Sequence, residues 1–174
     1  SSSSRGLGDV YKRQDEALPI AEKAVEAGAD ILFLPEYCSG LVSEEGMLKP
    51  PAAPDEDHPM VSVFQQFAKR TKVAVSLGSV AVSAASEKIV NRAIMISADG
   101  KVISRYDKIH LFDVQISATE VYRESATVIA GNHASIINLD DFKLAHVICY
   151  DLRFPQLFRD LAQAGAEVIA VPAA

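Results

Sequence analysis

Apolar residues recur at helical spacing in three segments of the chain, with polar residues at the positions between them. The first helix is expected to run from Asp15, a residue type that caps helices, to Gly28, a residue type that ends them. The second and third are expected to begin at Pro59 and Pro155, because proline is favoured in the first turn of a helix. Each segment gathers its apolar side chains on one face, so all three helices are predicted to pack against a core.

Short apolar runs between these helices predict β-strands. Residues 31–34 form an uninterrupted apolar run, which is typical of a strand covered on both faces. Asp99 and Gly100 form a hairpin signal between two further runs. Helices that alternate with strands in this way predict an α/β fold built in layers. Strands are expected at residues 31–34, 73–82, 91–98, 101–106, 135–139, 143–149 and 168–171.

Two stretches show neither the helical nor the strand period. Residues 1–14 open with four serines, and we interpret them as a non-native or disordered leader. If they are native, we expect them to form a mobile tail. The stretch 107–132 is expected to be irregular, and an irregular loop of that length inside a domain is usually either functional or wrongly assigned.

One sequence pattern occurs twice. Residues 27–35 and residues 164–172 both read Ala-Gly-Ala, an acidic residue, four apolar residues and a proline, and both follow a predicted helix. Two similar helix–strand units within one layered fold would produce this repeat. A common type of helix-to-strand connection would produce it equally well, so both interpretations stand at this point.

Composition narrows the class of protein. The chain has 174 residues, which suits one domain, and 49% of them are hydrophobic, with a net charge of −6. This acidic balance argues against a nucleic-acid partner and against an anionic membrane surface. No apolar run is long enough to span a bilayer or reads as a signal peptide. The 2 cysteines form no CxxC pair, so we expect a reducing, cytoplasmic location and no disulfide scaffold.

Cys149 is the first residue that could carry chemistry. It follows an apolar run and precedes the proline that begins the third helix. Backbone N–H groups and the helix dipole at such a turn favour both a thiolate and a developing oxyanion. A buried structural thiol is the alternative, because that is the commonest state of a single cysteine.

Glu36 and Lys108 are two further candidates. Glu36 directly follows a predicted buried strand, at the edge of the sheet where α/β proteins bind ligands. A partly desolvated carboxylate there could serve as a general base, although a solvated loop acid would give the same pattern. Lys108 could hold an oxyanion, or it could pair with a neighbouring acid at the surface.

Three blocks of sequence together resemble the signatures of a known family. They are Leu-Pro-Glu at residues 34–36, Tyr-Asp-Lys-Ile-His-Leu-Phe at 106–112 and Ile-Cys-Tyr-Asp-Leu-Arg-Phe-Pro at 148–155. In this order and spacing they resemble the carbon–nitrogen hydrolases of the nitrilase and amidase superfamily. The nearest branch is the nitrilase-like one that includes omega-amidase and deaminated glutathione amidase. The resemblance covers residues 15–174 and implies an α/β fold, a partial α-β-β-α sandwich of the nitrilase type.

The resemblance also implies a role for each residue in these blocks. Cys149 corresponds to the nucleophile, Glu36 to the general base and Lys108 to the group that stabilises the oxyanion, together with the backbone N–H of Tyr150. The implied reaction is cleavage of a small carboxylate-bearing amide to an acid and ammonia through a thioester. A nitrilase or an N-carbamoyl hydrolase would use the same residues. Neither a metal ion nor an organic cofactor is implied.

The family has a second glutamate, which orients the lysine. Its best match is Glu124, and spacing alone leaves Glu120 as a rival. The resemblance further implies a C-terminal continuation that completes the domain, so we expect this chain to be a fragment. The longer protein is expected to form a homodimer or a higher homo-oligomer. An inactive fragment that serves only as a structural or interaction module remains an alternative of another class.

The remaining candidates have weaker signals. Cys38 matches no motif position and is expected to be a small packing residue. Arg153 is expected to fix the turn after the nucleophile through a carboxylate, either Asp151 or Asp107. The pocket could be lined by aromatic side chains, namely Tyr37, Phe112 and Tyr150.

Overall fold

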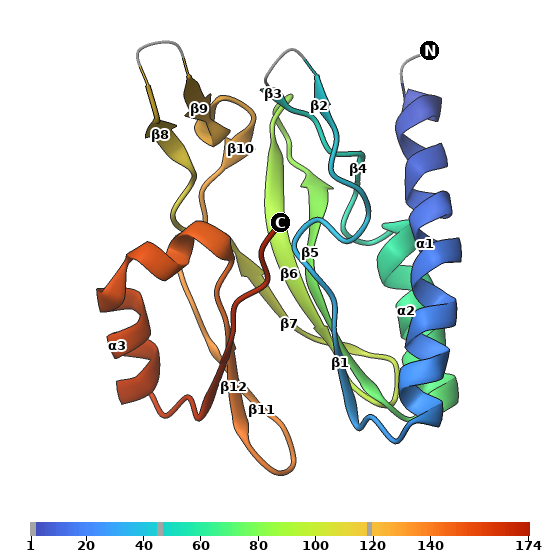
Figure 1. The fold of residues 1–174 in the computed structure, drawn as a ribbon. Coiled ribbons are helices and arrows are strands. Elements are labelled where there is room, and N and C mark those ends of the chain that lie inside the picture. The colour runs from blue at the N-terminus through green and yellow to red at the C-terminus, as the bar shows by residue number, and fades with distance from the viewer. Residues whose placement is uncertain (1–2, 45–46, 118–119) are drawn as a thin grey trace.

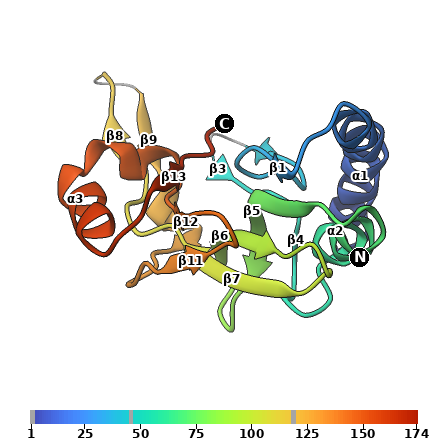
Figure 2. The same cartoon turned by 90° about the horizontal axis from the view of Figure 1, so that it is seen from below.

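Two β-sheets lie face to face, and helices cover the outer face of each sheet (Figure 1, Figure 2). This computed structural model describes residues 3–44, 47–117 and 120–174. Helices α1 and α2 lie on one side and α3 lies on the other, so the layers run helix, sheet, sheet, helix. The layered α/β fold predicted from the sequence is therefore confirmed. The helices span Ser3–Glu26, Pro59–Thr71 and Pro155–Gln163.

The larger sheet has β5 and β6 at its centre. Strand β1 runs parallel to β5, while β6 is antiparallel to both β5 and β7. The two faces of β6 divide the core, because Ile94 and Ile96 pack toward α1 and α2 whereas Met95 packs against the second sheet. The six strands are β1 (Ile31–Phe33), β4 (Ala52–Ala53), β5 (Ala74–Ser83), β6 (Ile89–Ile96), β7 (Val102–Asp107) and β10 (Val128–Ile129).

The second sheet is smaller and supports α3. Strand β12 is antiparallel to β11 and parallel to β13, and Leu161 of α3 packs on Ala145 and Val147. None of the helices in the described part of the chain is long and apolar enough to cross a membrane. The three strands are β11 (Ile136–Asn138), β12 (Lys143–His146) and β13 (Val168–Ala170). Two short hairpins pair β2 (Ser43–Glu44) with β3 (Met47–Leu48) and β8 (Asp113–Gln115) with β9 (Val121–Arg123).

Helix α1 begins earlier than the sequence pattern predicted. The expected start was Asp15, but the helix starts at Ser3, so residues 3–14 are helical and not a mobile tail. Val10 is fully buried and belongs to the same apolar cluster as Ala21. Their separation of three turns places both side chains on the face that packs on the core. The sequence pattern therefore placed the start of this helix too late, and residues 3–14 belong to it.

The stretch 107–132 is also more regular than expected. It contains the β8–β9 hairpin, the 3₁₀ helix η1 (Glu124–Ala126) and strand β10, which pairs with β6. Strands of two or three residues are too short to show an alternating pattern, so no signal for them can be found in the sequence. The turn of the hairpin at residues 118–119 lies outside the described part of the chain.

The repeated Ala-Gly-Ala pattern corresponds to two equivalent connections. Gly28 and Gly165 have φ angles of 93° and 99°, a region that favours glycine and ends a helix. Each glycine leads into a strand that runs parallel to its neighbour, β1 in the larger sheet and β13 in the smaller one. The two sequence segments therefore form the same helix-to-strand connection, once in each sheet.

A serine–histidine pair joins the two sheets in the interior. Oγ of Ser76 on β5 lies 2.8 Å from Nε2 of His146 on β12, and both side chains are buried. Burial lowers the pKa of His146 from 6.5 to about 4, because the imidazolium would lose its hydration. Burial likewise lowers the pKa of His58, whose Nδ1 caps α2, to about 4. Both histidines are therefore neutral at neutral pH.

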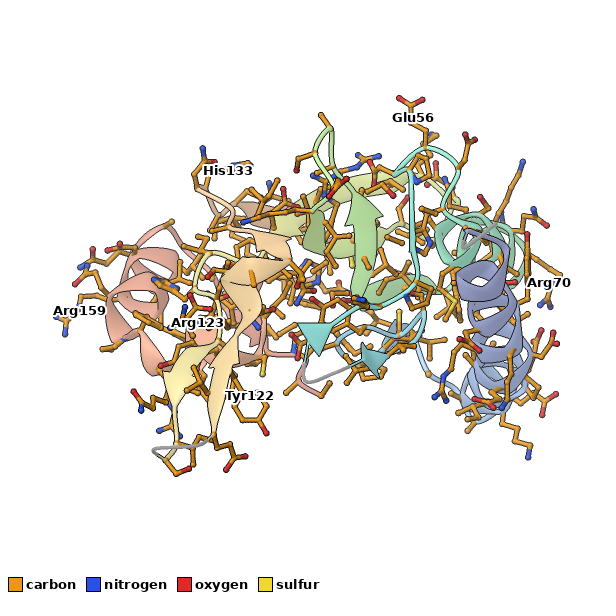
Figure 3. The ribbon with its side chains drawn as sticks, turned by 90° about the horizontal axis from the view of Figure 1, so that it is seen from above. Glu56, Arg70, Tyr122, Arg123, His133 and Arg159 are labelled. Atoms are coloured by element: carbon orange, nitrogen blue, oxygen red, sulfur yellow. The ribbon has the colours of Figure 1, made fainter. Side chains whose placement is uncertain are left out.

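We expect mild acid to destabilise the fold through these two histidines. Between pH 6.5 and about 4 the unfolded chain binds more protons than the folded chain, so stability falls as the pH is lowered. At the lower end, each buried histidine would account for roughly 3 kcal/mol of lost stability. Urea unfolding at several pH values measures this, and His146→Gln should flatten the dependence. His133→Gln, on the surface (Figure 3), is the control and should keep the wild-type dependence. A free energy of unfolding of the wild type that does not change with pH would contradict the prediction.

Candidate active site

The loop that carries Glu36 is held by β5. This strand has a register shift near its middle, and polar groups of Ser79 at the shift face the loop. Oγ of Ser79 accepts the N–H of Tyr37 at 2.8 Å, and its carbonyl accepts the N–H of Cys38 at 2.9 Å. Tyr37 has a φ of 49°, a left-handed conformation that a tyrosine keeps only when its surroundings fix it. The Glu36 side chain, 5% exposed, is therefore set in one direction.

Two glycines let the backbones around the site approach closely. A Cβ atom on Gly78 would lie 2.0 Å from the carbonyl oxygen of Leu34, at the start of the loop that β5 holds. A Cβ atom on Gly131 would lie 2.2 Å from the carbonyl oxygen of Asp107, the last residue of β7. The N–H of Gly131 also donates to the carbonyl of Lys108 at 2.8 Å. A larger residue at either position would displace a segment that carries a charged group of the site.

Lys108 lies between two buried carboxylates. Its Nζ is 3.2 Å from Oε1 of Glu36 and 2.9 Å from Oε2 of Glu124, and the lysine side chain is only 2% exposed. Burial disfavours the ammonium, but attraction from Glu36 and Glu124 outweighs burial and raises the pKa of Lys108. The lysine is therefore a fixed positive charge at neutral pH.

The structure distinguishes between the two glutamates that spacing left open. Glu124 begins η1 and is buried, and besides its contact with Lys108 it accepts the N–H of Phe112 at 2.6 Å. Glu120 is exposed on the β8–β9 hairpin and accepts a hydrogen bond from the hydroxyl of Tyr122. Only Glu124, of these two, lies beside the lysine.

Cys149 lies at the start of a short 3₁₀ helix. The sequence pattern extended the preceding strand to this residue, but β12 ends at His146 and η2 spans Cys149–Arg153. Cys149 has a φ of 48°, and its N–H donates to the carbonyl of Pro172 at 2.9 Å. The N–H of Tyr150 lies in the first turn of η2, where donors have no partner within the helix. The thiol is therefore presented on a strained turn beside an N–H group that could bind an anion.

Asp151 fixes this turn from behind. Its buried carboxylate accepts the hydroxyl of Tyr106 at 2.7 Å and the backbone N–H groups of His110 and Ile148, both at 2.9 Å. It thereby joins η2 to β7 and to the segment after Lys108. We expected Arg153 to fix the turn through a carboxylate, but Arg153 is exposed and the carboxylate of Asp151 is satisfied by these other donors.

The thiol of Cys149 is protonated in the resting site. Burial raises its pKa, the negative charge of Glu36 raises it further, and the positive charge of Lys108 partly opposes both effects. Burial and the negative charges of Glu124 and Glu36 also raise the pKa of Tyr37, so this phenol stays neutral. A thiol in this setting needs a base to remove its proton before it can act as a nucleophile.

The four side chains predicted to be catalytic line one pocket of about 430 Å³; they are Glu36, Lys108, Glu124 and Cys149. Tyr37 and Phe112 also line it, as expected, whereas the ring of Tyr150 packs edge-on against Phe112 and Phe154. Figure 3 shows Tyr122 and Arg123 on the hairpin that borders the pocket. The lining residues are Glu36, Tyr37, Leu41, Lys108, Phe112, Tyr122, Arg123, Glu124, Cys149 and Ala174.

Sequence reasoning missed Asn91 as a support of the charged groups, and it expected Asp151 to act with Arg153 and not with the donors it has. Asn91 is fully buried within β6 and contacts Glu36, and Asp151 holds the thiol-bearing turn. A polar residue in a predicted buried strand was the available signal for Asn91, but the pattern cannot show what it faces. Within the described residues, no three His, Cys, Asp or Glu side chains are arranged to hold a metal ion.

The sequence of the chain is similar to those of known proteins. Residues 8–174 match the model of the carbon-nitrogen hydrolase family. A deaminated glutathione amidase from Synechocystis sp. is 37% identical over 95% of this chain and 62% of that protein. The chloroplastic omega-amidase of Arabidopsis thaliana is 29% identical over 95% of this chain and 46% of that protein. The chain thus spans roughly half to three fifths of the length of these relatives.

Solved structures show the same fold. The NitFhit protein of C. elegans superposes with a TM-score of 0.82 at 26% identity, over 95% of this chain and 41% of that one. The NitN amidase from Neterenkonia sp. AN1 superposes with a TM-score of 0.76 at 20% identity, over 94% of this chain and 61% of that one. Because the family model matches nearly the whole sequence and the fold is shared, this chain belongs to the carbon-nitrogen hydrolase family.

Proposed function

We propose that the site hydrolyses a small carboxylate-bearing amide to an acid and ammonia through a thioester on Cys149. One observation carries the proposal: Glu36, Lys108, Glu124 and Cys149 line the same pocket, although they come from separate parts of the chain. A thiol with a base and a fixed cation at its side is the arrangement that nucleophilic acyl transfer needs. The names of the relatives, deaminated glutathione amidase and omega-amidase, support the choice of an amide.

In the first step Glu36 takes the proton from the thiol, and the sulfur attacks the amide carbon. The raised pKa of Cys149 makes this transfer necessary, since the thiolate is not formed in advance. The carbonyl oxygen becomes negative as the carbon turns tetrahedral. Nζ of Lys108 and the N–H of Tyr150 are the donors available to it.

Acylation is completed when the tetrahedral intermediate collapses. Glu36 returns its proton to the nitrogen, the C–N bond breaks and ammonia leaves, so that the acyl group remains on sulfur as a thioester. Glu36, again a carboxylate, then takes a proton from water as the water attacks the thioester. The second tetrahedral intermediate then breaks its C–S bond, Glu36 gives the proton back to the sulfur, and release of the acid leaves the thiol and the carboxylate as they were. Glu124 touches Lys108 throughout and keeps its ammonium in place.

Trapping the acyl-enzyme tests this mechanism. The chain is mixed with simple amides that carry a carboxylate, quenched in acid within seconds, digested and analysed by mass spectrometry, while ammonia is measured in parallel. We expect an acyl group on the peptide that contains Cys149, none on the peptide that contains Cys38, and ammonia in step with turnover. Nitriles and N-carbamoyl compounds in the same panel distinguish the related activities. Ammonia release with no acyl group on Cys149 would refute the thioester.

A further inference from the structure

Asn91 is connected to three of the four charged or reactive groups of the site. It lies on β6 and is fully buried. Its Nδ2 donates to Oε1 of Glu36 at 2.9 Å and reaches Oε1 of Glu124 at 3.5 Å. Its backbone carbonyl accepts the N–H of Lys108 at 3.0 Å. One residue of a rigid central strand thus holds two carboxylates by its side chain and the lysine by its main chain.

The two carboxylate oxygens of Glu36 have different hydrogen-bond donors. Oε1 receives both Nδ2 of Asn91, at 2.9 Å, and Nζ of Lys108, at 3.2 Å. Oε2 receives only the backbone N–H of Ala174, at 3.1 Å, within the described residues. Because Oε1 already has two donors, Oε2 is the oxygen left to accept a further proton. Removing Nδ2 would free the carboxylate to rotate and exchange the two oxygens.

An uncharged donor is needed at this position for electrostatic reasons. The cluster already holds two carboxylates against one ammonium, and all three side chains are nearly buried. A second lysine would neutralise the base, and an aspartate would add a third anion. An amide N–H supports the carboxylates without changing the charge, and its hydrogen bonds to them offset the cost of burying that N–H group.

We propose that Asn91 is a positioning residue that fixes Glu36 with Oε2 toward the thiol of Cys149. It also keeps Glu36, Glu124 and Lys108 at fixed positions relative to one another. This inference rests on the proposed function, because it assigns Asn91 a part in delivering the thiol proton to Glu36. The ionisable groups that surround Asn91 and would respond to a charge there are Glu36, Tyr37, Lys108, Glu124 and Cys149.

Two substitutions and one control test the assignment. Asn91→Ser removes the reach of Nδ2 without adding charge, and we expect kcat for amide hydrolysis to fall about 30-fold with little change in KM. Asn91→Asp preserves size but adds an anion, and we expect the pH midpoint for alkylation of Cys149 by iodoacetamide to rise by about one pH unit. Asn138→Asp makes the same chemical change on an exposed strand position and should alter neither quantity.

The measurements separate positioning from mere folding. All rates are referred to the amount of alkylatable Cys149, and thermal unfolding is recorded for every variant. A residue that only stabilised the fold would lower the melting temperature of Asn91→Ser and leave its kcat per alkylatable Cys149 unchanged, which would overturn the proposal. If Asn91→Asp does not fold, a kcat of Asn91→Ser equal to that of the wild type is enough by itself to overturn the proposal. Alkylation of Cys149 needs no turnover, so a shifted midpoint supports the assignment of Asn91 even if no amide is hydrolysed. A failure to hydrolyse any amide would refute only the proposed function.

Discussion

Replacing Cys149 with alanine is expected to lower kcat for amide hydrolysis by at least about 10⁴-fold, because Cys149 supplies the sulfur of the proposed thioester. Only the binding pocket and the oxyanion donors would remain to accelerate attack by water. The fold should be retained, since the change removes one sulfur atom and keeps the backbone hydrogen bond from this residue to Pro172. Ammonia release from a panel of amides, followed over hours for the variant, measures the loss.

Cys38 is the matched control for this substitution. It is the other cysteine of the chain, and burial raises its pKa to about 12, so it is not a reactive thiolate at neutral pH. Cys38→Ala should keep kcat within about threefold of wild type, even if it loses some stability by leaving space in the core. A Cys149→Ala protein that hydrolyses amides at more than about a tenth of the wild-type rate would exclude a cysteine mechanism.

The residues that meet in the pocket could be named from the sequence because the three that define its blocks each stand in a short, distinctive segment. Glu36 follows an apolar run and a proline, Lys108 lies among a distinctive set of neighbours, and Cys149 stands between an apolar run and a helix start. Each block therefore carries both a local structure and a residue of defined chemistry. What the sequence could not show was the distance between the blocks, which the pairing of β1 with β5 and of β7 with β6 determines.

The supporting residues could not be predicted because their partners are distant in the chain. Asn91 lies 55 positions from Glu36, and Asp151 lies 45 positions from Tyr106. In a strand, alternation shows only that a side chain points inward, and a polar residue there is equally compatible with an edge or a bulge. The early start of α1 was missed for a related reason, since residues 1–14 contain few apolar residues, too few to define a helical period.

Replacing Lys108 with methionine is expected to affect both stability and catalysis. Methionine has a similar length but no charge, so Glu36 and Glu124, which are 6% and 8% exposed, would face each other without a counter-ion. Loss of one partner from a buried ion pair costs about 3–5 kcal/mol. Catalysis should fall by at least about 10³-fold at every pH, because the oxyanion loses a charged donor.

The pH dependence of this loss of stability has a definite sign. Protonation of one of the two carboxylates relieves their repulsion, so the folded variant would bind one more proton than its unfolded chain in weakly acidic solution. Stability should therefore be closest to wild type near pH 5 and fall as the pH rises toward about 8. Urea unfolding at these two pH values measures the difference. A variant as stable as wild type at the higher pH would mean that the lysine is not the counter-ion of this pair.

A double substitution separates the two roles of Lys108. In Lys108→Met with Glu124→Gln, one negative charge is removed along with the positive one, and most of the stability lost at higher pH should return. The rate of amide hydrolysis should not return, because the neutral pair still offers no cation to the oxyanion. Glu124→Gln alone should be more active than the double variant, since Lys108 keeps its contact with Glu36. If the double variant recovered both stability and rate, Lys108 would be a counter-ion only, and the oxyanion would depend on backbone donors such as the N–H of Tyr150.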